Sequence, residues 1–236
     1  VVTKKFLQLN PPALNDQASD IERVTACSGD KVINSIQLLR ELPDALRQEN
    51  FKTTFVYGDG ELVSVEPGDT TQRLYGVAVD VGTTTVAGYL YDLNTGKKLD
   101  VYSVLNPQRK FGADVLSRVD HTAKSDSGQK DMNNAIIECI NLMIERFTER
   151  NSITNTDIYA VVFVGNTVMM HFLLNLTAKN IAVSPFIPVT TQLCKFSAGE
   201  IGVNINKKGH VITFPCISGY VGADTVAAVL SSGMYE

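Results

Sequence analysis

The stretch of sequence that decides the fold of this chain is residues 74–86, which read LYGVAVDVGTTTV. An apolar strand runs into the lone carboxylate of Asp80, and a second apolar stretch turns back after a glycine and three threonines. A carboxylate buried at a strand end is costly unless something binds it, and the usual ligand is a hydrated divalent cation. The stretch therefore predicts either an ordinary hairpin with a threonine-rich turn or a phosphate-binding hairpin.

The residues of the turn have the chemistry that a phosphate site needs. Gly82 allows a ligand to approach the backbone closely, because it has no Cβ atom. Thr83, Thr84 and Thr85 offer hydroxyl groups and backbone N–H groups within one tight turn, which is the composition of an anion-binding nest.

From residue 74 to residue 231, the sequence shows the periodicities of strands and helices. Strands are predicted at residues 74–81, 86–93, 98–105, 157–164 and 210–214, and helices at 112–122, 129–150, 165–176 and 222–231. The resulting α/β order is β-β-β-α-β-α-β-α, with the two helices at 112–122 and 129–150 sharing the first helical position, and it is the ribonuclease H-like order. It predicts a five-stranded mixed sheet with the strand order 3-2-1-4-5.

The first 72 residues predict a small α+β domain. Strand patterns cover residues 5–9, 51–57 and 61–65, and helical patterns cover 20–27 and 31–42, with a turn that starts at Pro43 and ends near residue 48. A polar, turn-rich linker follows, so we expect domains at 1–72 and 73–236. About 70 residues bury only a marginal core. We expect this domain to serve docking or homodimer contact, with a passive spacer as the alternative.

Composition excludes several classes of function. The chain has 236 residues, 44% of them hydrophobic, and 21 basic against 25 acidic residues give a net charge of −4. The sequence contains no long run of basic residues, so nothing in it indicates nucleic-acid binding. No apolar run approaches the ~20 residues of a membrane span. A signal peptide is not recognisable, and the chain does not begin with Met. We expect a cytoplasmic protein without nucleic-acid or membrane contact, and a fragment of a longer chain.

The cysteines are too far apart for an iron–sulfur or zinc motif. They are Cys27, Cys139, Cys194 and Cys216. We interpret them as buried free thiols, so any iron–sulfur cluster must lie outside this chain.

Two further turns follow predicted strands, where ligands of open α/β sheets bind. Gly165, Asn166 and Thr167 open a helix, so Asn166 is either its N-cap or a residue facing a phosphate or water, and both roles can hold together. Gly222 permits a tight strand-to-helix turn before Asp224. Asp224 either stabilises the first helical turn or orients a metal or water in a cleft.

The aspartate–glycine–threonine hairpin in this element order resembles the actin, sugar kinase and Hsp70 ATPase superfamily, whose ATP site lies between two such lobes. Three longer segments resemble the ATP-dependent reductive activators of corrinoid proteins. They are NPQRKFGADVLSR at 106–118, VGNTVMMH at 164–171 and GYVGADTVA at 219–227.

The resemblance implies a middle domain followed by the first lobe of an actin-like ATPase domain. Such activators use ATP to help deliver a low-potential electron to Co(II) in a corrinoid protein, and their [2Fe–2S] cluster lies in an upstream domain that this chain lacks. It also implies that Asp80 holds Mg²⁺ through water and that Gly82, Thr83 and Thr84 contact ATP phosphates.

The other strand-end residues complete the implied site. Asn166 and Asp224 are the implied partners of Asp80 in catalysis, and the remaining nucleotide contacts are Thr85, Gly165, Thr167 and Gly222. The segment 106–109 has no assigned role, and Arg109 could pair with a phosphate, with a partner protein or with a surface carboxylate.

Two other functions remain open from the sequence. A lobe of a sugar- or acetate-type kinase shares the fold and the hairpin. A non-catalytic, partner-binding module is the second alternative, because only one lobe of an ATP site is present and the chain alone is expected to be inactive.

Overall fold

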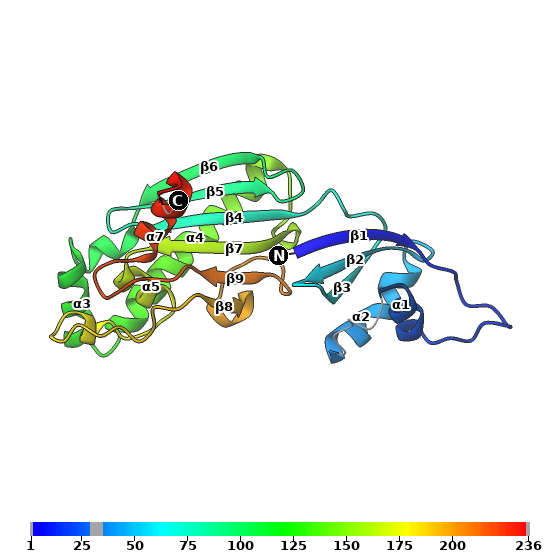
Figure 1. The fold of residues 1–236 in the computed structure, drawn as a ribbon, viewed down its shortest axis with the longest axis horizontal. Coiled ribbons are helices and arrows are strands. Elements are labelled where there is room, and N and C mark those ends of the chain that lie inside the picture. Colours follow the sequence, from blue (N-terminus) through cyan, green and yellow to red (C-terminus); the bar gives the residue numbers. More distant parts are fainter. Residues whose placement is uncertain (1, 29–34, 235–236) are drawn as a thin grey trace. The chain divides into compact units, whose positions relative to one another are not determined.

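The computed structural model describes residues 2–28 and 35–234 (Figure 1). The chain forms two compact units, Val1–Leu74 and Tyr75–Glu236, which are described separately.

The first unit is an antiparallel sheet covered by two helices. The sheet has the order β1-β2-β3, with β1 at Val2–Gln8, β2 at Lys52–Gly58 and β3 at Glu61–Pro67. The helices are α1, Asp20–Ser28, and α2, Ile36–Arg47. Leu38, Leu42 and Leu46 of α2 are buried with Phe55 and Leu62 from the sheet, and they form the core of this unit.

The predicted turn at Pro43 is wrong, because α2 continues through this proline to Arg47. A proline inside a helix costs about 3 kcal/mol, because it removes a hydrogen bond and crowds the preceding turn. Burying Ala45 and Leu46 offsets this cost, since a buried leucine side chain contributes ~1.5–3 kcal/mol. The helix begins later than predicted, where the Ser35 hydroxyl accepts from the Leu38 amide at 3.0 Å. Residues 31–34 of the prediction lie outside the described residues.

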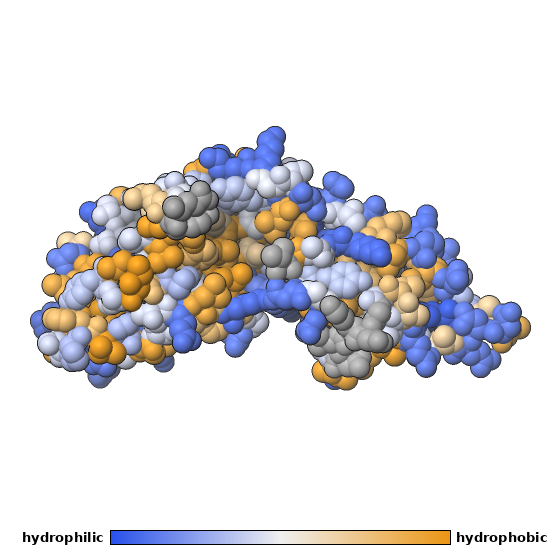
Figure 2. Space-filling view, viewed as in Figure 1, coloured by the Kyte–Doolittle hydropathy of each residue, from blue (hydrophilic) through white to orange (hydrophobic). Residues whose placement is uncertain are grey.

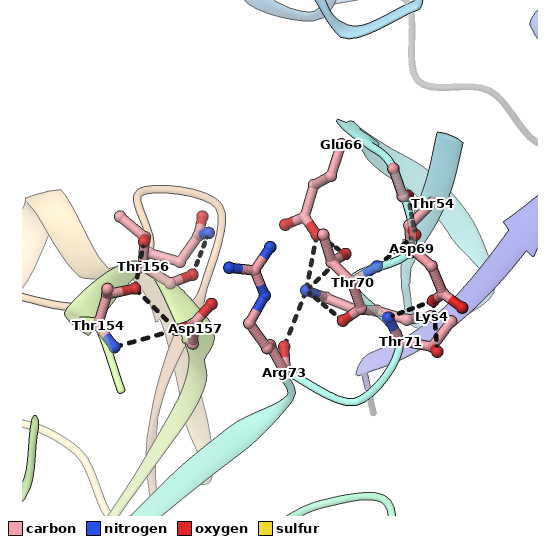
Figure 3. A network of polar contacts seen from close by, with 12 residues as sticks. Lys4, Thr54, Glu66, Asp69, Thr70, Thr71, Arg73, Thr154, Thr156 and Asp157 are labelled. Carbon is pink, nitrogen blue, oxygen red and sulfur yellow. Dashed lines mark hydrogen bonds and ion pairs between the residues drawn. The ribbon is translucent and has the colours of Figure 1, made fainter. Parts of the chain in front are cut away.

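A polar network links β1 and β2 to the end of β3 and the segment that follows it (Figure 3). The ammonium group of Lys4 on β1 donates to the Glu66 carboxylate at 2.7 Å and to the Arg73 carbonyl oxygen at 2.9 Å. Thr70 bridges the same carboxylate to β2, because its amide donates to the Thr54 hydroxyl at 2.9 Å. These contacts tie the segment after β3 to its own sheet.

The second unit contains a mixed sheet with the strand order β6-β5-β4-β7-β9-β8. Its strands are β4 Tyr75–Val81, β5 Thr85–Asp92, β6 Lys98–Leu105, β7 Ile158–Gly165, β8 Cys194–Ser197 and β9 His210–Thr213. The strand β4 pairs antiparallel with β5 and parallel with β7, and β7 pairs parallel with β9. The predicted α/β class and the order 3-2-1-4-5 are therefore confirmed.

The sheet has a sixth strand that the sequence did not predict. The strand β8 is four residues long and pairs antiparallel with β9 at the sheet edge. Because so short a segment shows no diagnostic periodicity, its pairing with β9 alone makes it a strand.

Helices cover both faces of this sheet, with α4 and α7 on opposite sides (Figure 1). The α-helices are α3 Val115–Lys124, α4 Gly128–Asn151, α5 Thr167–Leu173, α6 Ala198–Ile201 and α7 Ala223–Ser232. Short 3₁₀ turns are η1 Pro107–Lys110, η2 Asn155–Asp157 and η3 Lys179–Ile181. The helix α5 ends before the predicted residue 176, because Asn175 has a φ of 55° and interrupts the helical path.

The helix α4 packs closely onto the hairpin that contains the threonine-rich turn. Met132, Ile136, Ile140 and Met143 form its buried stripe. At Gly88 on β5, an added Cβ atom would lie 2.0 Å from the Met143 sulfur, so a larger residue would displace the Met143 side chain. This packing supports β4 and β5 from one side.

One cysteine departs from the sequence interpretation. Cys139 is buried and Cys194 and Cys216 are partly buried, but Cys27 is exposed at the end of α1. Burial raises the pKa of the Cys139 thiol to about 11, so this group stays protonated near neutral pH.

In the described part of the chain, none of the helices combines the length and apolar character needed to cross a membrane.

Candidate functional site

Close glycine contacts bring three chain segments together at the carboxyl ends of β4 and β7. An added Cβ atom at Gly165 would lie 2.7 Å from the Val81 carbonyl oxygen. An added Cβ atom at Gly222 would lie 2.5 Å from the Asn166 Cα atom and 2.6 Å from the Gly165 carbonyl oxygen. The end of β4, the β7–α5 turn and the turn before α7 therefore touch through their backbones.

Asn166 joins the β7–α5 turn to the threonine hairpin. Its side-chain oxygen accepts from the Met169 amide at 3.0 Å, which is the N-cap contact of α5. Its side-chain nitrogen donates to the Thr83 hydroxyl at 3.1 Å. Both polar ends of the Asn166 side chain are thus engaged within the chain, and they position Thr83.

Thr167 makes the corresponding link to the segment before α7. Its hydroxyl donates to the Ser218 carbonyl oxygen at 2.6 Å. The residue is buried, so this hydroxyl anchors the turn that carries Gly222.

Asp80 and Asp224 form the acidic part of the site. Asp80 is an exposed residue, so the expectation that its carboxylate is buried is wrong. Partial desolvation, and next the negative charge of Asp224, nevertheless raise the pKa of Asp80. Asp224 is also exposed, in the first turn of α7, and accepts from the Thr225 amide at 2.7 Å. Neighbouring carboxylates that repel each other are suited to binding a cation between them.

The threonines differ in their surroundings. Thr83 is half-buried and held by Asn166, whereas Thr84 and Thr85 are exposed. Thr85 is already the first residue of β5. An added Cβ atom at Gly82 would lie 2.6 Å from the Thr85 carbonyl oxygen, so the turn tolerates only glycine there.

Three buried polar residues lie behind the hairpin and were not predicted as site residues from the sequence, namely Asn106, Gln108 and Arg118. Asn106 caps η1, and its side-chain nitrogen donates to the Gly82 carbonyl oxygen at 2.8 Å. A guanidinium N–H of Arg118 donates to the Thr83 carbonyl oxygen at 2.6 Å. A recognisable sign was present, because Arg118 lies between Val115, Val119 and Thr122 on the inward face of α3, where an arginine is unusual.

Arg109 lies near this buried group but makes none of the ion pairs seen among the described residues. Its side chain is exposed, and the surface salt bridge considered from the sequence is absent from that part of the chain.

An apolar pocket of about 240 Å³ lies beside Asn166. Its walls include Val115, Val119, Val168, Ile181 and Tyr220. Hydrophobic residues also reach the surface of the same unit, at the left of Figure 2. Among those most exposed are Val183, Ile187, Ile217 and Tyr220.

Comparison with family models covers nearly the whole chain. Residues 1–72 match the model described as the RACo linker region, and residues 75–236 match the RACo middle region.

Two individual proteins are similar to this chain. The curated corrinoid activation enzyme RamQ of Eubacterium limosum is 33% identical over 195 residues, which is 82% of this chain and 33% of that protein. The solved structure of a reductive activator for a corrinoid, iron–sulfur protein superposes with a TM-score of 0.86 at 32% identity, covering 98% of this chain and 38% of that one. The chain thus spans about a third of the length of RamQ and 38% of the length of the solved activator.

Proposed function

Because the chain belongs to the RACo family, as its linker-region and middle-region matches show, we propose that it is part of an ATP-dependent activator of a corrinoid protein. The activator supports the reduction of Co(II) to Co(I) in that partner. The unit Tyr75–Glu236 contributes one side of the ATP site. The observation that carries this proposal is the meeting of the Asp80 hairpin, Asn166 and the Asp224 turn at the ends of parallel strands.

The residues at these strand ends fit Mg²⁺ and ATP. Asp80 and Asp224 would hold hydrated Mg²⁺, since their mutual repulsion is relieved by a cation between them. The turn from Gly82 to Thr84 would bind phosphate oxygens through its amides and hydroxyls. When bound, Mg²⁺ neutralises charge on the phosphates. Catalysis of phosphoryl transfer is mostly such positioning and charge stabilisation, so no activated nucleophile is required.

The remaining strand-end residues act as supports in this proposal. Asn166 positions the Thr83 hydroxyl, and Thr167 anchors the turn that carries Gly222 and Asp224. Gly165 and Gly222 allow the backbones to approach closely enough for these contacts.

The wider assignments also belong to the proposal. The electron donor is a [2Fe–2S] cluster in an upstream domain, the partner is a corrinoid protein, and the setting is the cytoplasm. The unit Val1–Leu74 either docks a partner protein or forms a homodimer. Light scattering of the purified protein would reveal the homodimer.

The test is the Asp80→Asn variant of the full-length protein, measured for ATP turnover and for formation of Co(I) by absorbance. Because Asp80 acts through the metal, turnover should fall by about 10²-fold or more while ATP affinity changes far less. Asp120→Asn is the matched control, since Asp120 is exposed on α3 and pairs only with Lys124 in the contacts described.

Unchanged turnover in Asp80→Asn would remove Asp80 from the mechanism. A phosphorylated small-molecule product without Co(I) would favour the kinase alternative. Binding of the corrinoid protein that is the same with and without nucleotide, together with no turnover, would favour the non-catalytic module.

A further inference from the structure

Three consecutive carbonyl groups of the threonine hairpin are bound by a single segment of the chain. The Gly82 carbonyl oxygen accepts from the Asn106 side chain at 2.8 Å, and the Thr83 carbonyl oxygen accepts from Arg118 at 2.6 Å. The Thr84 carbonyl oxygen accepts from the Asn106 backbone amide at 2.9 Å. Residues 106–118 therefore bind the acceptor side of the whole turn.

These contacts decide which way the amides of the turn point. In a planar trans peptide, the carbonyl oxygen of one residue and the N–H of the next lie on opposite sides. Holding the Gly82 and Thr83 carbonyl groups against residues 106–118 directs the amides of Thr83 and Thr84 the other way. Outside the strand ladders, neither amide donates a hydrogen bond to any group in the described ranges. Both are thus available to an anion.

The two donor residues are themselves held firmly. Asn106 is 1% exposed, and its side-chain oxygen accepts from the Gln108 amide at 2.9 Å. Gln108 in turn donates to the Met132 carbonyl oxygen of α4 at 2.9 Å. Arg118 is 0% exposed, and its Nε donates to the Gly112 carbonyl oxygen at 3.0 Å. The hairpin is therefore supported by the core of the unit.

Arg118 also brings a positive charge beneath the turn. No carboxylate of the described residues lies within ion-pair distance of its guanidinium group. Its hydrogen bonds go to backbone carbonyl groups, which do not neutralise the charge, and Met169 contributes only a sulfur contact at 3.4 Å. Burial, and next the charge of Arg109, lower the pKa of Arg118, and the opposing charge of Asp114 offsets them only in part. An anion bound on the outer side of the turn would supply the negative charge that compensates Arg118.

We propose that Asn106 and Arg118 are positioning residues that hold the Gly82–Thr84 turn in its anion-binding orientation, with Arg118 adding attraction for the bound polyphosphate. This inference rests on the proposed function, because it takes the turn to be the phosphate site. It gives a role to Asn106 of the segment 106–109, to which the sequence assigned none.

The experiment measures tripolyphosphate and MgATP binding by calorimetry in the full-length protein, together with amide hydrogen exchange across residues 82–86. Asn106→Asp keeps the contact to the Gln108 amide but loses the donor to Gly82. Arg118→Lys keeps the charge but loses the paired hydrogen bonds of the guanidinium group to two backbone carbonyl oxygens. Arg118→Met loses both the charge and these hydrogen bonds. Arg146→Met is the control, because Arg146 is an exposed residue of α4 paired with Glu149.

Asn106→Asp and Arg118→Met should each weaken tripolyphosphate binding by about tenfold or more, as expected for the loss of a buried neutral hydrogen bond in the first variant and of charge-assisted hydrogen bonds in the second. Arg118→Lys should recover part of the loss, and exchange should increase at residues 82–86 before it increases elsewhere. The control should match the wild type. Thermal unfolding identifies any arginine variant that fails to fold, in which case Asn106→Asp decides the matter.

Folded variants with wild-type affinity and wild-type exchange at residues 82–86 would overturn the inference and leave the proposed function intact. Equal loss of affinity and stability in Arg118→Met, without faster exchange in the hairpin, would also overturn it. A wild-type protein that binds neither tripolyphosphate nor MgATP would instead refute the proposed function.

Discussion

At the scale of single residues, the candidate site depends on electrostatic pairs that the folded chain creates. Asp80 and Asp224 are 144 positions apart in sequence, as 224 − 80 shows, yet the charge of one raises the pKa of the other. The positive charge of Arg109 lowers the pKa of Arg118, after burial as the larger cause.

The carboxylate pair leads to a prediction for Asp224→Asn. Removing this negative charge should lower the pKa of Asp80, because its ionised form is no longer repelled. The pKa should stay above the ordinary value, since desolvation is the larger cause. Carbon NMR of the labelled Asp80 carboxyl group would measure it, and an unchanged pKa would show that the two groups do not interact.

A second prediction concerns His171, which is 2% exposed in α5. Its Nε2 accepts from the Val189 amide at 2.9 Å, so its Nδ1 carries the proton and donates to the Thr167 carbonyl oxygen at 2.7 Å. Burial lowers the pKa of His171. The unfolded chain therefore binds the proton more tightly than the folded one, and stability should fall as the pH drops below ~6.5.

The measurement is urea unfolding at about pH 7.5 and about pH 5, compared with His171→Gln, which cannot titrate. The wild type should lose more stability than the variant on acidification, by up to ~1.4 kcal/mol for each unit that its pKa is lowered. An identical pH dependence in both proteins would exclude His171 as the cause.

At the scale of secondary-structure elements, close backbone contacts join the turns of the site in addition to the side-chain hydrogen bonds of Asn166 and Thr167. The β7–α5 turn and the turn before α7 touch where Gly222 lies against Asn166. Gly222 has a φ of −87°, which any residue can adopt. The requirement for glycine at this position is therefore one of space and not of backbone conformation.

Gly222→Ala should consequently destabilise the unit by about 1–3 kcal/mol, the usual cost of overpacking. The control is Gly199→Ala in α6, where an added Cβ atom meets nothing within 4 Å. That change should be neutral or stabilising by up to ~1 kcal/mol, as expected in a helix. Urea unfolding measures both, and equal stability of the two variants would contradict the close contact at Gly222.

At the scale of the whole molecule, the unit Tyr75–Glu236 has its own core but carries one side of the proposed ATP site. Its buried residues form one cluster that spans the sheet, α4 and α5. The superfamily resemblance implies a site enclosed between two lobes. With one lobe, the phosphate contacts face solvent.

Residues 1–236 alone are accordingly expected to fold but not to hydrolyse ATP. In water, a charge contact at 4 Å contributes about 1 kcal/mol, compared with about 4 kcal/mol near a protein surface. Because the phosphate contacts of this chain alone face water, ATP binding should be weak. A coupled phosphate-release assay measures turnover, and circular dichroism checks folding. Turnover that is abolished by Asp80→Asn would show that this chain contains a complete site.

The sequence by itself determined the α/β class, the order of five strands and the family resemblance. Alternating and helical periodicities are local properties, and the turn residues from Gly82 to Thr85 are contiguous, so both can be read without coordinates. The tertiary structure alone decided the strand β8, the continuation of α2 through Pro43 and the contacts of Asn106 and Arg118 with the hairpin. Each depends on partners distant in sequence, because edge pairing, burial and buried hydrogen bonds gain their free energy only once those partners meet.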